Sequence, residues 1–211
     1  GDPTPTPDPE PTPTPGPQEP GRTERWDRPV PIGISTGHPA MTAGTIGALV
    51  TDGNGSYFAL SNNHVYADEN QASVGDEVIQ PGTFDGGNAP ADTLGTLADF
   101  EPINFGGVNV FDAAIAEVND GVGGADVRNQ TPSDGYGSPT TSVGNPAPRM
   151  KVQKYGRTTG QTKGRVWAVN ASINVGYDYG VALFTGQVVV RGGGFSAGGD
   201  SASLIVDDNN N

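Results

Sequence analysis

Short apolar runs separated by turn-forming residues make up most of the chain from about Trp26 onward. In the first half these runs occupy residues 29–35, 44–50, 56–61, 76–82 and 92–100, and in the second half residues 150–156, 164–177, 181–190 and 201–208. Runs of this kind, bounded by Gly, Pro, Asn and Asp, are typical of β-strands. Because the chain contains 33 glycines and 19 prolines, it is poorly suited to long helices, and the pattern predicts an all-β protein.

The sequence TDGNGS at residues 51–56 separates two of these runs, GALV and YFAL. Turn-forming residues between two apolar runs predict a β-hairpin, which leads directly into SNNHV at residues 61–65. The acidic and amide oxygens of the turn also suggest a calcium loop as an alternative. The spaced ligands and closing Glu of such a loop are missing, so a hairpin turn is the preferred interpretation.

Composition divides the chain into four segments. Residues 1–25 form a predicted disordered, Pro/Thr-rich linker, since the first 20 contain almost no apolar side chain except proline. A β-rich unit at 26–120 and another at 149–211 are joined by a Gly-, Ser- and Pro-rich connection at 121–148. Spacers like the first segment are common in secreted or surface proteins, so an extracellular or cell-surface location is expected, although no signal peptide is visible.

Charge and cysteine content exclude several classes of function. The 24 acidic and 11 basic residues give a net charge of −13, which disfavours binding to nucleic acid or anionic lipid. The absence of cysteine excludes disulfides, thiolate metal sites and cysteine nucleophiles. No run of about 18 apolar residues occurs, so no membrane span is predicted.

Two histidines are present, and one of them is a candidate general base. A serine nucleophile needs a base to remove its proton and a third group to orient that base. His64 ends a β-rich run and is the candidate, although a lone His is more often structural. His38 precedes Pro39 in a polar turn and is interpreted as structural. Because His64 must be neutral to act as a base, activity is expected to rise through about pH 6 to 7.

Asp112 and Ser201 are the candidate partners of this base. Asp112 lies in VNVFDAAIAEV, where a carboxylate inside an apolar strand requires a partner that the His64 N–H would supply. An acidic residue at the solvent side of a strand end explains the spacing equally well. Ser201 lies in GFSAGGDSASLIV, and the glycines allow Gly199 and Ser201 to serve as backbone donors of an oxyanion hole. The alternative for GDS alone is a simple β-turn.

Together, NNHV, FDAAIA and GDSAS resemble the catalytic motifs of trypsin-like serine proteases: Asp112 follows His64 by 48 positions, and Ser201 follows Asp112 by 89. The strings GHPAMTAGTIGALV and VQKYGRTTGQTKGRV resemble a cysteine-free bacterial branch of these enzymes. The resemblance, over about residues 30–211, implies the chymotrypsin fold, with the site in a cleft between two β-barrels. It also implies hydrolysis of protein or peptide substrates through an acyl-enzyme, with no metal or organic cofactor.

Further residues take their interpretation from this resemblance. In that branch Arg157 to Gly160 open the second barrel, so GRTTG is interpreted as architecture. A phosphate cradle is the alternative, but no Walker-type lysine and helix follow. Phe195 and Ser196 precede the turn where the floor of the specificity pocket would lie and are candidate substrate-binding residues. No acidic residue occupies that stretch, so a preference for Lys or Arg is disfavoured.

The chain departs from the family pattern in two places. Ala202 stands where the family has Gly, and ten residues follow Ser201, fewer than the strands that normally come after the nucleophile require. The second barrel is therefore predicted to be incomplete, as in a C-terminally truncated protease that a complementary C-terminal segment would complete. These departures leave open a non-catalytic protease-like binding module, and the shared chemistry leaves open an esterase with the same triad.

Overall fold

Strands make up almost all of the regular structure in the computed structural model, which describes residues 18–119 and 124–211. They are β1 (Val30–Pro31), β2 (Ser35–Thr36), β3 (Gly44–Thr45), β4 (Ala48–Thr51), β5 (Tyr57–Ser61), β6 (Glu77–Ile79), β7 (Thr93–Phe100), β8 (Val108–Asn109), β9 (Ala114–Glu117), β10 (Val127–Arg128), β11 (Lys151–Gly156), β12 (Gly160–Tyr177), β13 (Gly180–Arg191) and β14 (Ile205–Asp207). The short helices are α1 (Asn63–Tyr66), η1 (Asp68–Asn70) and η2 (Thr83–Asp85). Across the described ranges, no helix is long and apolar enough to cross a membrane.

The first half is built around a five-stranded sheet in the order β4-β5-β9-β7-β6, in which all neighbours are antiparallel. β4 and β5 form the predicted hairpin, with Ala48 opposite Leu60. The carboxylate of Asp52 closes its turn by accepting the backbone N–H groups of Asn54 (2.8 Å) and Ser56 (3.1 Å). An Asp that caps a turn in this way is the ordinary use of the residue, in agreement with the hairpin interpretation.

The core of the first half forms where this sheet packs against the short strands and α1. Along β9, Ala114 and Ala116 are buried while Glu117 is exposed, which is the alternation of a strand with one face in the core. Almost fully buried apolar side chains of this core include Ile32, Ile34, Ile46, Val65, Tyr66, Val78, Leu94 and Leu97. Their packing holds β5 and α1 in place, and His64 lies on α1 shortly after the end of β5.

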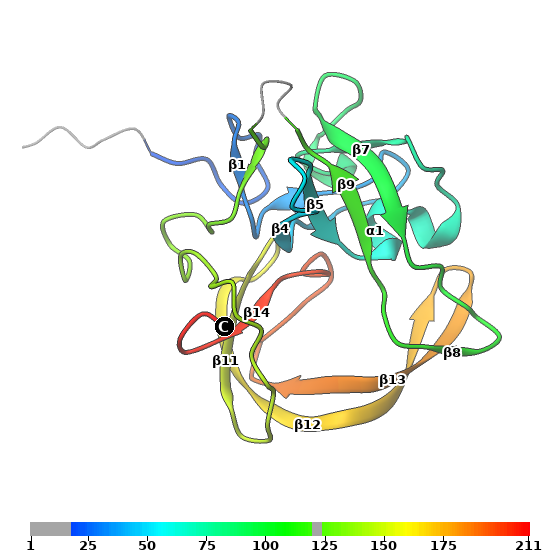
Figure 1. Ribbon diagram of the computed structural model, residues 1–211, viewed down its shortest axis with the longest axis vertical. Coiled ribbons are helices and arrows are strands. Elements are labelled where there is room, and N and C mark those ends of the chain that lie inside the picture. The colour runs from blue at the N-terminus through cyan, green and yellow to red at the C-terminus, as the bar shows by residue number, and fades with distance from the viewer. Residues whose placement is uncertain (1–17, 120–123) are drawn as a thin grey trace, which may run out of the picture.

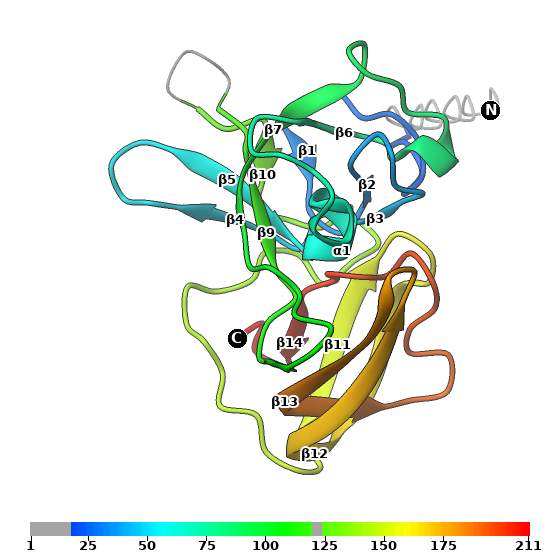
Figure 2. The ribbon, with the colours of Figure 1, turned by 90° about the vertical axis from the view of Figure 1, so that its right-hand side faces the viewer.

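The second half is a five-stranded sheet in the order β14-β11-β12-β13-β8. β12 spans 18 residues and β13 spans 12, and the two form a long curved ribbon that gives the sheet the shape of a half-barrel (Figure 1). Shifts in register along the β12–β13 pair mark β-bulges, which bend and twist paired strands. The turned view in Figure 2 shows the ribbon below the first half, with β14 and β11 beside it. The predicted all-β architecture is confirmed for the described residues, and the second sheet closes only part of a barrel.

Strand pairing links the predicted segments to one another at two places. β8 lies within the predicted first unit at 26–120, yet it pairs with β13, with Val108 opposite Leu183. β10 lies within the predicted connection at 121–148, yet it pairs with β1. The folded part also begins before residue 26, since the carbonyl of Arg22 accepts the N–H of Ser35 at 2.9 Å. Residues 1–17 of the predicted linker, and residues 120–123 at the predicted boundary, lie outside the described residues.

Candidate active site

His64 is the second residue of α1, three residues after the end of β5. The neighbouring Asn63 is fully buried and fixes the helix by donating to the Glu101 carbonyl (2.7 Å) and to the Asn70 side chain (2.8 Å). Strand pairing of β5 between β4 and β9 fixes the other end of the segment. His64 therefore projects from a rigid turn, and its side chain keeps 24% of its surface exposed.

His64 and Asp112, called here the His–Asp pair, are in direct contact. The Nδ1 atom of His64 lies 2.6 Å from Oδ2 of Asp112, and the His64 backbone N–H donates to Oδ1 at 3.3 Å. Burial alone would raise the pKa of the Asp112 carboxyl, but the hydrogen bond from His64 and the His64 charge outweigh it and hold that pKa below its usual range. A charged carboxylate at Nδ1 places the ring proton there and leaves Nε2 as the acceptor that a general base requires.

The backbone around Asp112 differs from the prediction. The sequence suggested that Asp112 lies inside one apolar strand, but the chain forms β8 and β9 with Asp112 in the segment between them. The preceding Val110 and Phe111 are 51% and 64% exposed, so the apolar run is not a buried strand at this point. The partnership with His64 nevertheless has the predicted geometry, since the carboxylate is partly buried and paired.

Ser201 lies in the loop between β13 and β14, residues 192–204, called here the serine loop. Thr45 of β3 fastens this loop to the first half: its N–H donates to the Ser201 carbonyl (3.0 Å) and its hydroxyl donates to the Gly199 carbonyl (2.9 Å). The Thr45 carbonyl in turn accepts the Ser61 hydroxyl at the end of β5 (3.0 Å). Hydrogen bonds thus connect the serine loop to β5, the strand that precedes His64.

The structure brings His64 and Asp112 together, and it attaches the serine loop to the same region without joining the Ser201 hydroxyl to the imidazole. Among the described residues, no hydrogen bond links that hydroxyl to His64. Figures 1 and 2 both draw the serine loop passing next to α1. Contacts between a nucleophile and its base are often long in unliganded enzymes and tighten when substrate binds.

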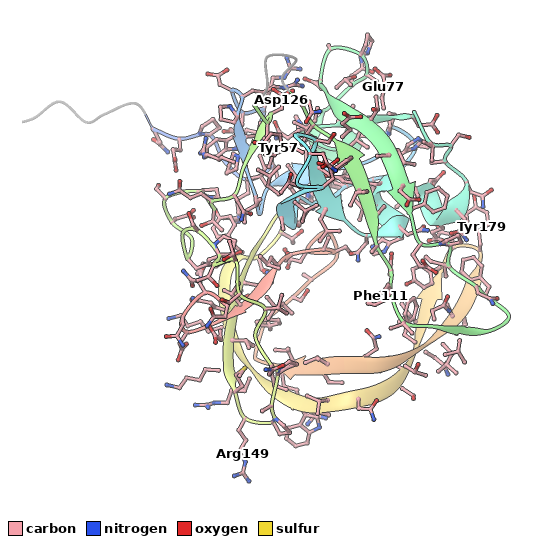
Figure 3. All side chains as sticks on the ribbon, viewed as in Figure 1. Tyr57, Glu77, Phe111, Asp126, Arg149 and Tyr179 are labelled. Carbon is pink, nitrogen blue, oxygen red and sulfur yellow. The ribbon has the colours of Figure 1, made fainter. Side chains whose placement is uncertain are left out.

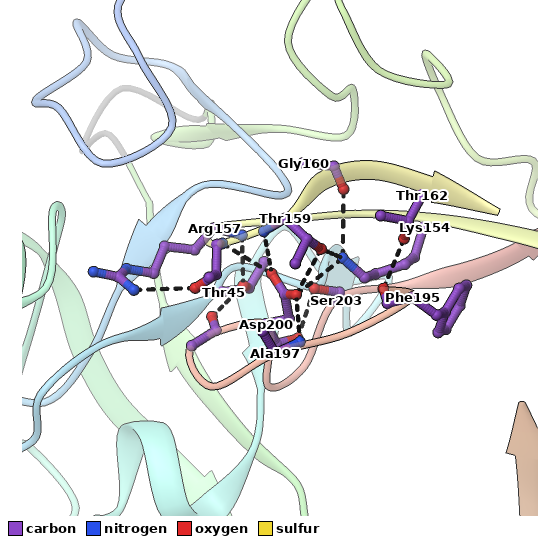
Figure 4. Close-up of polar contacts among 12 residues, drawn as sticks. Thr45, Lys154, Arg157, Thr159, Gly160, Thr162, Phe195, Ala197, Asp200 and Ser203 are labelled. Carbon is purple, nitrogen blue, oxygen red and sulfur yellow. Dashed lines mark hydrogen bonds and ion pairs between the residues drawn. The ribbon is translucent and has the colours of Figure 1, made fainter. Parts of the chain in front are cut away.

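The carboxylate of Asp200, next to Ser201, organises the serine loop (Figure 4). Its Oδ1 accepts the backbone N–H groups of Thr158 (2.8 Å) and Thr159 (3.1 Å). Its Oδ2 accepts the Thr159 hydroxyl (2.7 Å) and the Ala197 N–H (3.0 Å), and it lies 3.2 Å from Nζ of Lys154. The side chains of Lys154 and Asp200 are almost completely buried. Burial alone would raise the pKa of the Asp200 carboxyl, but the hydrogen bonds from Thr159 and other donors hold that pKa below its usual range.

The backbone of the serine loop has left-handed residues on both sides of Asp200 and Ser201. Gly199 has φ +92°, and a Cβ added there would lie 2.6 Å from the Thr158 hydroxyl oxygen. Both the backbone conformation and the lack of space therefore require glycine at this position. Ala202, which stands where the family has glycine, has φ +70°, a left-handed conformation that strains a residue with a Cβ. Among the described residues, neither the Gly199 nor the Ser201 backbone N–H has an acceptor. The turn therefore leaves the two donors predicted for an oxyanion hole unused.

The GRTTG segment joins β11 to β12 and contacts both halves. Arg157 forms a two-point contact with Asp85 of η2 in the first half, with Nε 2.7 Å from Oδ2. A phosphate-binding loop would need free backbone N–H groups here, but the N–H groups of Thr158 and Thr159 donate hydrogen bonds to the Asp200 carboxylate. These contacts support the interpretation of GRTTG as architecture.

Phe195 and Ser196 differ from each other in exposure. The Phe195 side chain is 7% exposed and packs with Val152 and Val166 in the core of the second half, while Ser196 is exposed. The Phe195 ring is therefore part of a core rather than an accessible pocket floor. His38 has the structural contacts expected of it, since its Nδ1 accepts the Ala40 N–H at 3.2 Å and its Nε2 lies 3.4 Å from Asp76.

Sequence reasoning missed the side chains that support the site from the second half. Lys154 lies on the same face of β11 as Val152, and a lysine in register with a buried valine is a signal for a buried partner. Tyr177, whose hydroxyl donates to Oδ2 of Asp112 at 3.0 Å, gives no comparable signal. It is 65 positions away from Asp112 in the chain, and the folded arrangement of both halves brings it there.

Comparison with known proteins gives matches in structure alone. No family model matches the chain, and no curated protein matches its sequence. Thermobifida fusca protease A is 17% identical with a TM-score of 0.56, and the match covers 85% of this chain and 78% of that one. Alpha-lytic protease homolog N4 is 19% identical with a TM-score of 0.58, covering 85% and 80%. A glutamic acid specific serine protease is 22% identical with a TM-score of 0.56, covering 83% and 79%.

These similarities establish the fold. The chain has the chymotrypsin fold found in bacterial serine proteases, as the motifs implied.

Proposed function

We propose that this protein is a serine endopeptidase that hydrolyses peptide bonds through an acyl-enzyme. The observation that carries the proposal is the contact of 2.6 Å between His64 Nδ1 and Asp112 Oδ2, made on a chymotrypsin fold whose serine loop is hydrogen-bonded to the same region. We assign His64 as general base, Asp112 as the group that orients it, and Ser201 as nucleophile. The proposed substrate is an extended segment of protein or peptide, met outside the cell.

The proposed reaction begins when Ser201 Oγ attacks the substrate carbonyl carbon and His64 Nε2 accepts the hydroxyl proton. The negative charge then moves to the carbonyl oxygen, where the N–H groups of Gly199 and Ser201 stabilise it. As the C–N bond breaks, the imidazolium transfers its proton to the leaving amine. Water adds to the acyl-enzyme, His64 takes the proton of that water, and the acid is released as Ser201 regains its hydrogen. No step uses a metal or an organic cofactor.

For the substrate side chain before the cleaved bond, the sequence supports only the exclusion of a preference. No acidic side chain occupies residues 192–198, so we expect no preference for Lys or Arg at the position before the cleaved bond. Phe195 contributes to this stretch through its backbone, since its ring is buried.

The test is covalent labelling with a fluorophosphonate, combined with hydrolysis of casein. We expect the wild-type chain to be labelled at Ser201, and Ser201→Ala to lose both labelling and hydrolysis. Ser142→Ala, a change at an exposed serine outside the serine loop, is the control and should behave as wild type. A folded wild-type protein that is neither labelled nor active would overturn the proposal.

Two observations favour the competing function of a non-catalytic binding module. The Ser201 hydroxyl makes no hydrogen bond to His64 among the described contacts, and Ala202 holds a strained φ of +70° beside the nucleophile. Absence of labelling in a folded chain that still binds a peptide would support that alternative. An esterase would use the same triad, and a comparison of rates on matched ester and peptide substrates separates it from a peptidase.

A further inference from the structure

The tip of the β12–β13 hairpin, residues 177–180, is fastened to the first half by Glu69. The Glu69 carboxylate accepts two consecutive backbone N–H groups, from Asp178 to Oε1 and from Tyr179 to Oε2, both at 3.1 Å. Glu69 is 6% exposed, so this is a nearly buried carboxylate used on main-chain donors of the other half. Figure 3 labels Tyr179 at this meeting of the hairpin with the first half.

The backbone at Glu69 is strained, which indicates that the orientation of its carboxylate toward the hairpin tip is a constrained feature of the fold. Asp68, Glu69 and Asn70 have φ values of +46°, +52° and +77°, which are left-handed conformations that L-residues rarely adopt in succession. Such strain tends to persist where the structure is constrained by a specific role. The Asn70 side chain holds the turn by accepting the Ile103 N–H at 2.8 Å and donating to the Ile103 carbonyl at 2.9 Å.

The docked hairpin places Tyr177 against the His–Asp pair. The Tyr177 hydroxyl donates to Oδ2 of Asp112 at 3.0 Å, the same oxygen that lies 2.6 Å from His64 Nδ1. Its ring stands edge-on to the imidazole with centroids 5.9 Å apart, and it packs on Phe105 and Phe184. Burial and the Asp112 charge raise the pKa of Tyr177, so the hydroxyl remains a proton donor at neutral pH.

We propose that Tyr177 is a positioning residue for the His–Asp pair, and that Glu69 holds it in place through the hairpin tip. The proposal deepens the proposed function, on which it rests. A second donor on Oδ2 fixes the plane of the Asp112 carboxylate and spreads its charge, and the ring limits rotation of the imidazole. The second half would thereby assist the general base of the first half, which makes the alignment of His64 depend on docking of the two halves.

The test compares Tyr177→Phe, which keeps the ring and removes the hydroxyl, with the matched control Tyr179→Phe on the same hairpin. Tyr179 is 58% exposed and contacts Glu69 through its backbone, so its phenol should not matter. We expect Tyr177→Phe to label with fluorophosphonate roughly ten-fold more slowly, the loss of about one hydrogen bond to a charged group. Tyr179→Phe should match wild type, and equal rates for all three proteins would overturn the proposal.

A second readout does not depend on activity. The chain has two histidines, so the Nδ1 proton of His64 can be assigned by NMR with the help of His38→Asn. The groups facing His64 among the described residues are Asp112 and Tyr177, with Glu69 beyond Tyr177. Loss of the hydroxyl leaves Oδ2 to the imidazole alone, so we expect the resonance to move downfield in Tyr177→Phe and to stay in place in Tyr179→Phe. An unmoved resonance would contradict the proposal even if the wild-type chain proves inactive.

The role of Glu69 is tested separately with Glu69→Gln, which keeps one acceptor oxygen and removes the charge. We expect a smaller change of the same sign in labelling and in the His64 resonance, together with faster amide exchange at Asp178 and Tyr179. Faster amide exchange at the hairpin tip with an unchanged His64 resonance would show that the Glu69 contact does not act on His64 through Tyr177. If wild type is not labelled at all, the proposed function fails, while the NMR comparison still decides the placement of Tyr177.

Discussion

Ala202 holds a left-handed backbone conformation beside the proposed nucleophile, with φ +70°. We predict that Ala202→Gly raises the free energy of unfolding by up to about 1 kcal/mol, because relief of the left-handed strain exceeds the entropy that glycine adds to the unfolded chain. Ala197→Gly, in the same loop but without positive φ, should instead lower the stability by about 0.5–1 kcal/mol. Urea unfolding of both variants gives the comparison, and a loss of stability in Ala202→Gly would contradict the strain.

Asp112 is predicted to be essential as a charge and not merely as a hydrogen-bond partner. Asp112→Asn should lower the rate of labelling about 10⁴-fold, since an amide favours the wrong tautomer of the imidazole. Asp208→Asn, an exposed change, is the control and should leave the rate unchanged.

The charge state of Asp112 also affects the pH profile of labelling. Because the pKa of Asp112 is held below its usual range, the carboxylate stays charged as the pH falls from neutrality toward about 5. The Asp112 carboxyl should therefore contribute no ionisation to the labelling profile between about pH 4 and 5, the ordinary carboxyl range. An ionisation of Asp112 in that range, seen in wild type and lost in Asp112→Asn, would show that the carboxylate is not stabilised in its charged form.

At the scale of elements, the serine loop depends on the buried pair of Lys154 and Asp200. Asp200→Asn removes the negative charge beside the buried Lys154 ammonium, which otherwise has two neutral acceptors, the Thr159 hydroxyl and the Gly160 carbonyl. We predict a loss of about 3–5 kcal/mol, the cost of leaving a buried charge unpaired. Lys154→Met should cost less, because Asp200 keeps its four other hydrogen-bond donors. Denaturant unfolding gives both values, and a larger loss in Lys154→Met would reverse the assigned roles.

The stability of this pair also carries a pH dependence. A carboxyl whose folded pKa is depressed contributes stability above its unfolded pKa, and that contribution is lost as pH falls through the folded pKa. Wild type should therefore lose stability in acid below about pH 4, and the difference from Asp200→Asn should shrink there.

The elements that could be predicted from the sequence are those set by local patterns. The hairpin of β4 and β5 follows from TDGNGS between two apolar runs, and its register is fixed by that turn. β8 was not foreseen as part of the second sheet, because two residues pairing with a strand some 75 positions away leave no local pattern. His64 and Asp112 were predictable through their motifs, whereas Tyr177 and Glu69 act through long-range docking that residue type and spacing do not encode.

At the scale of the molecule, polar contacts join the two halves at several separate places. Arg157 contacts Asp85, Thr45 holds the serine loop, and Glu69 holds the hairpin tip. β8 adds backbone pairing from one half to the sheet of the other. In an isolated half, the polar groups of these contacts would lose their hydrogen-bond and ion-pair partners. Docking of the two halves should therefore be coupled to their folding.

We therefore predict that the two halves unfold in a single cooperative transition. Each half contains one tryptophan, Trp26 in the first and Trp167 on β12 in the second. Trp167 is 59% exposed, so Trp167→Phe should be tolerated and leave Trp26 as a reporter of the first half. Its fluorescence transition in urea should coincide with the circular dichroism transition of the whole chain.

Arg157→Ala removes a contact that holds the halves together and should move both midpoints down by the same amount. Two separate midpoints would mean that each half is stable alone, and the alignment of His64 by Tyr177 would then be a docking equilibrium rather than a fixed property of the fold.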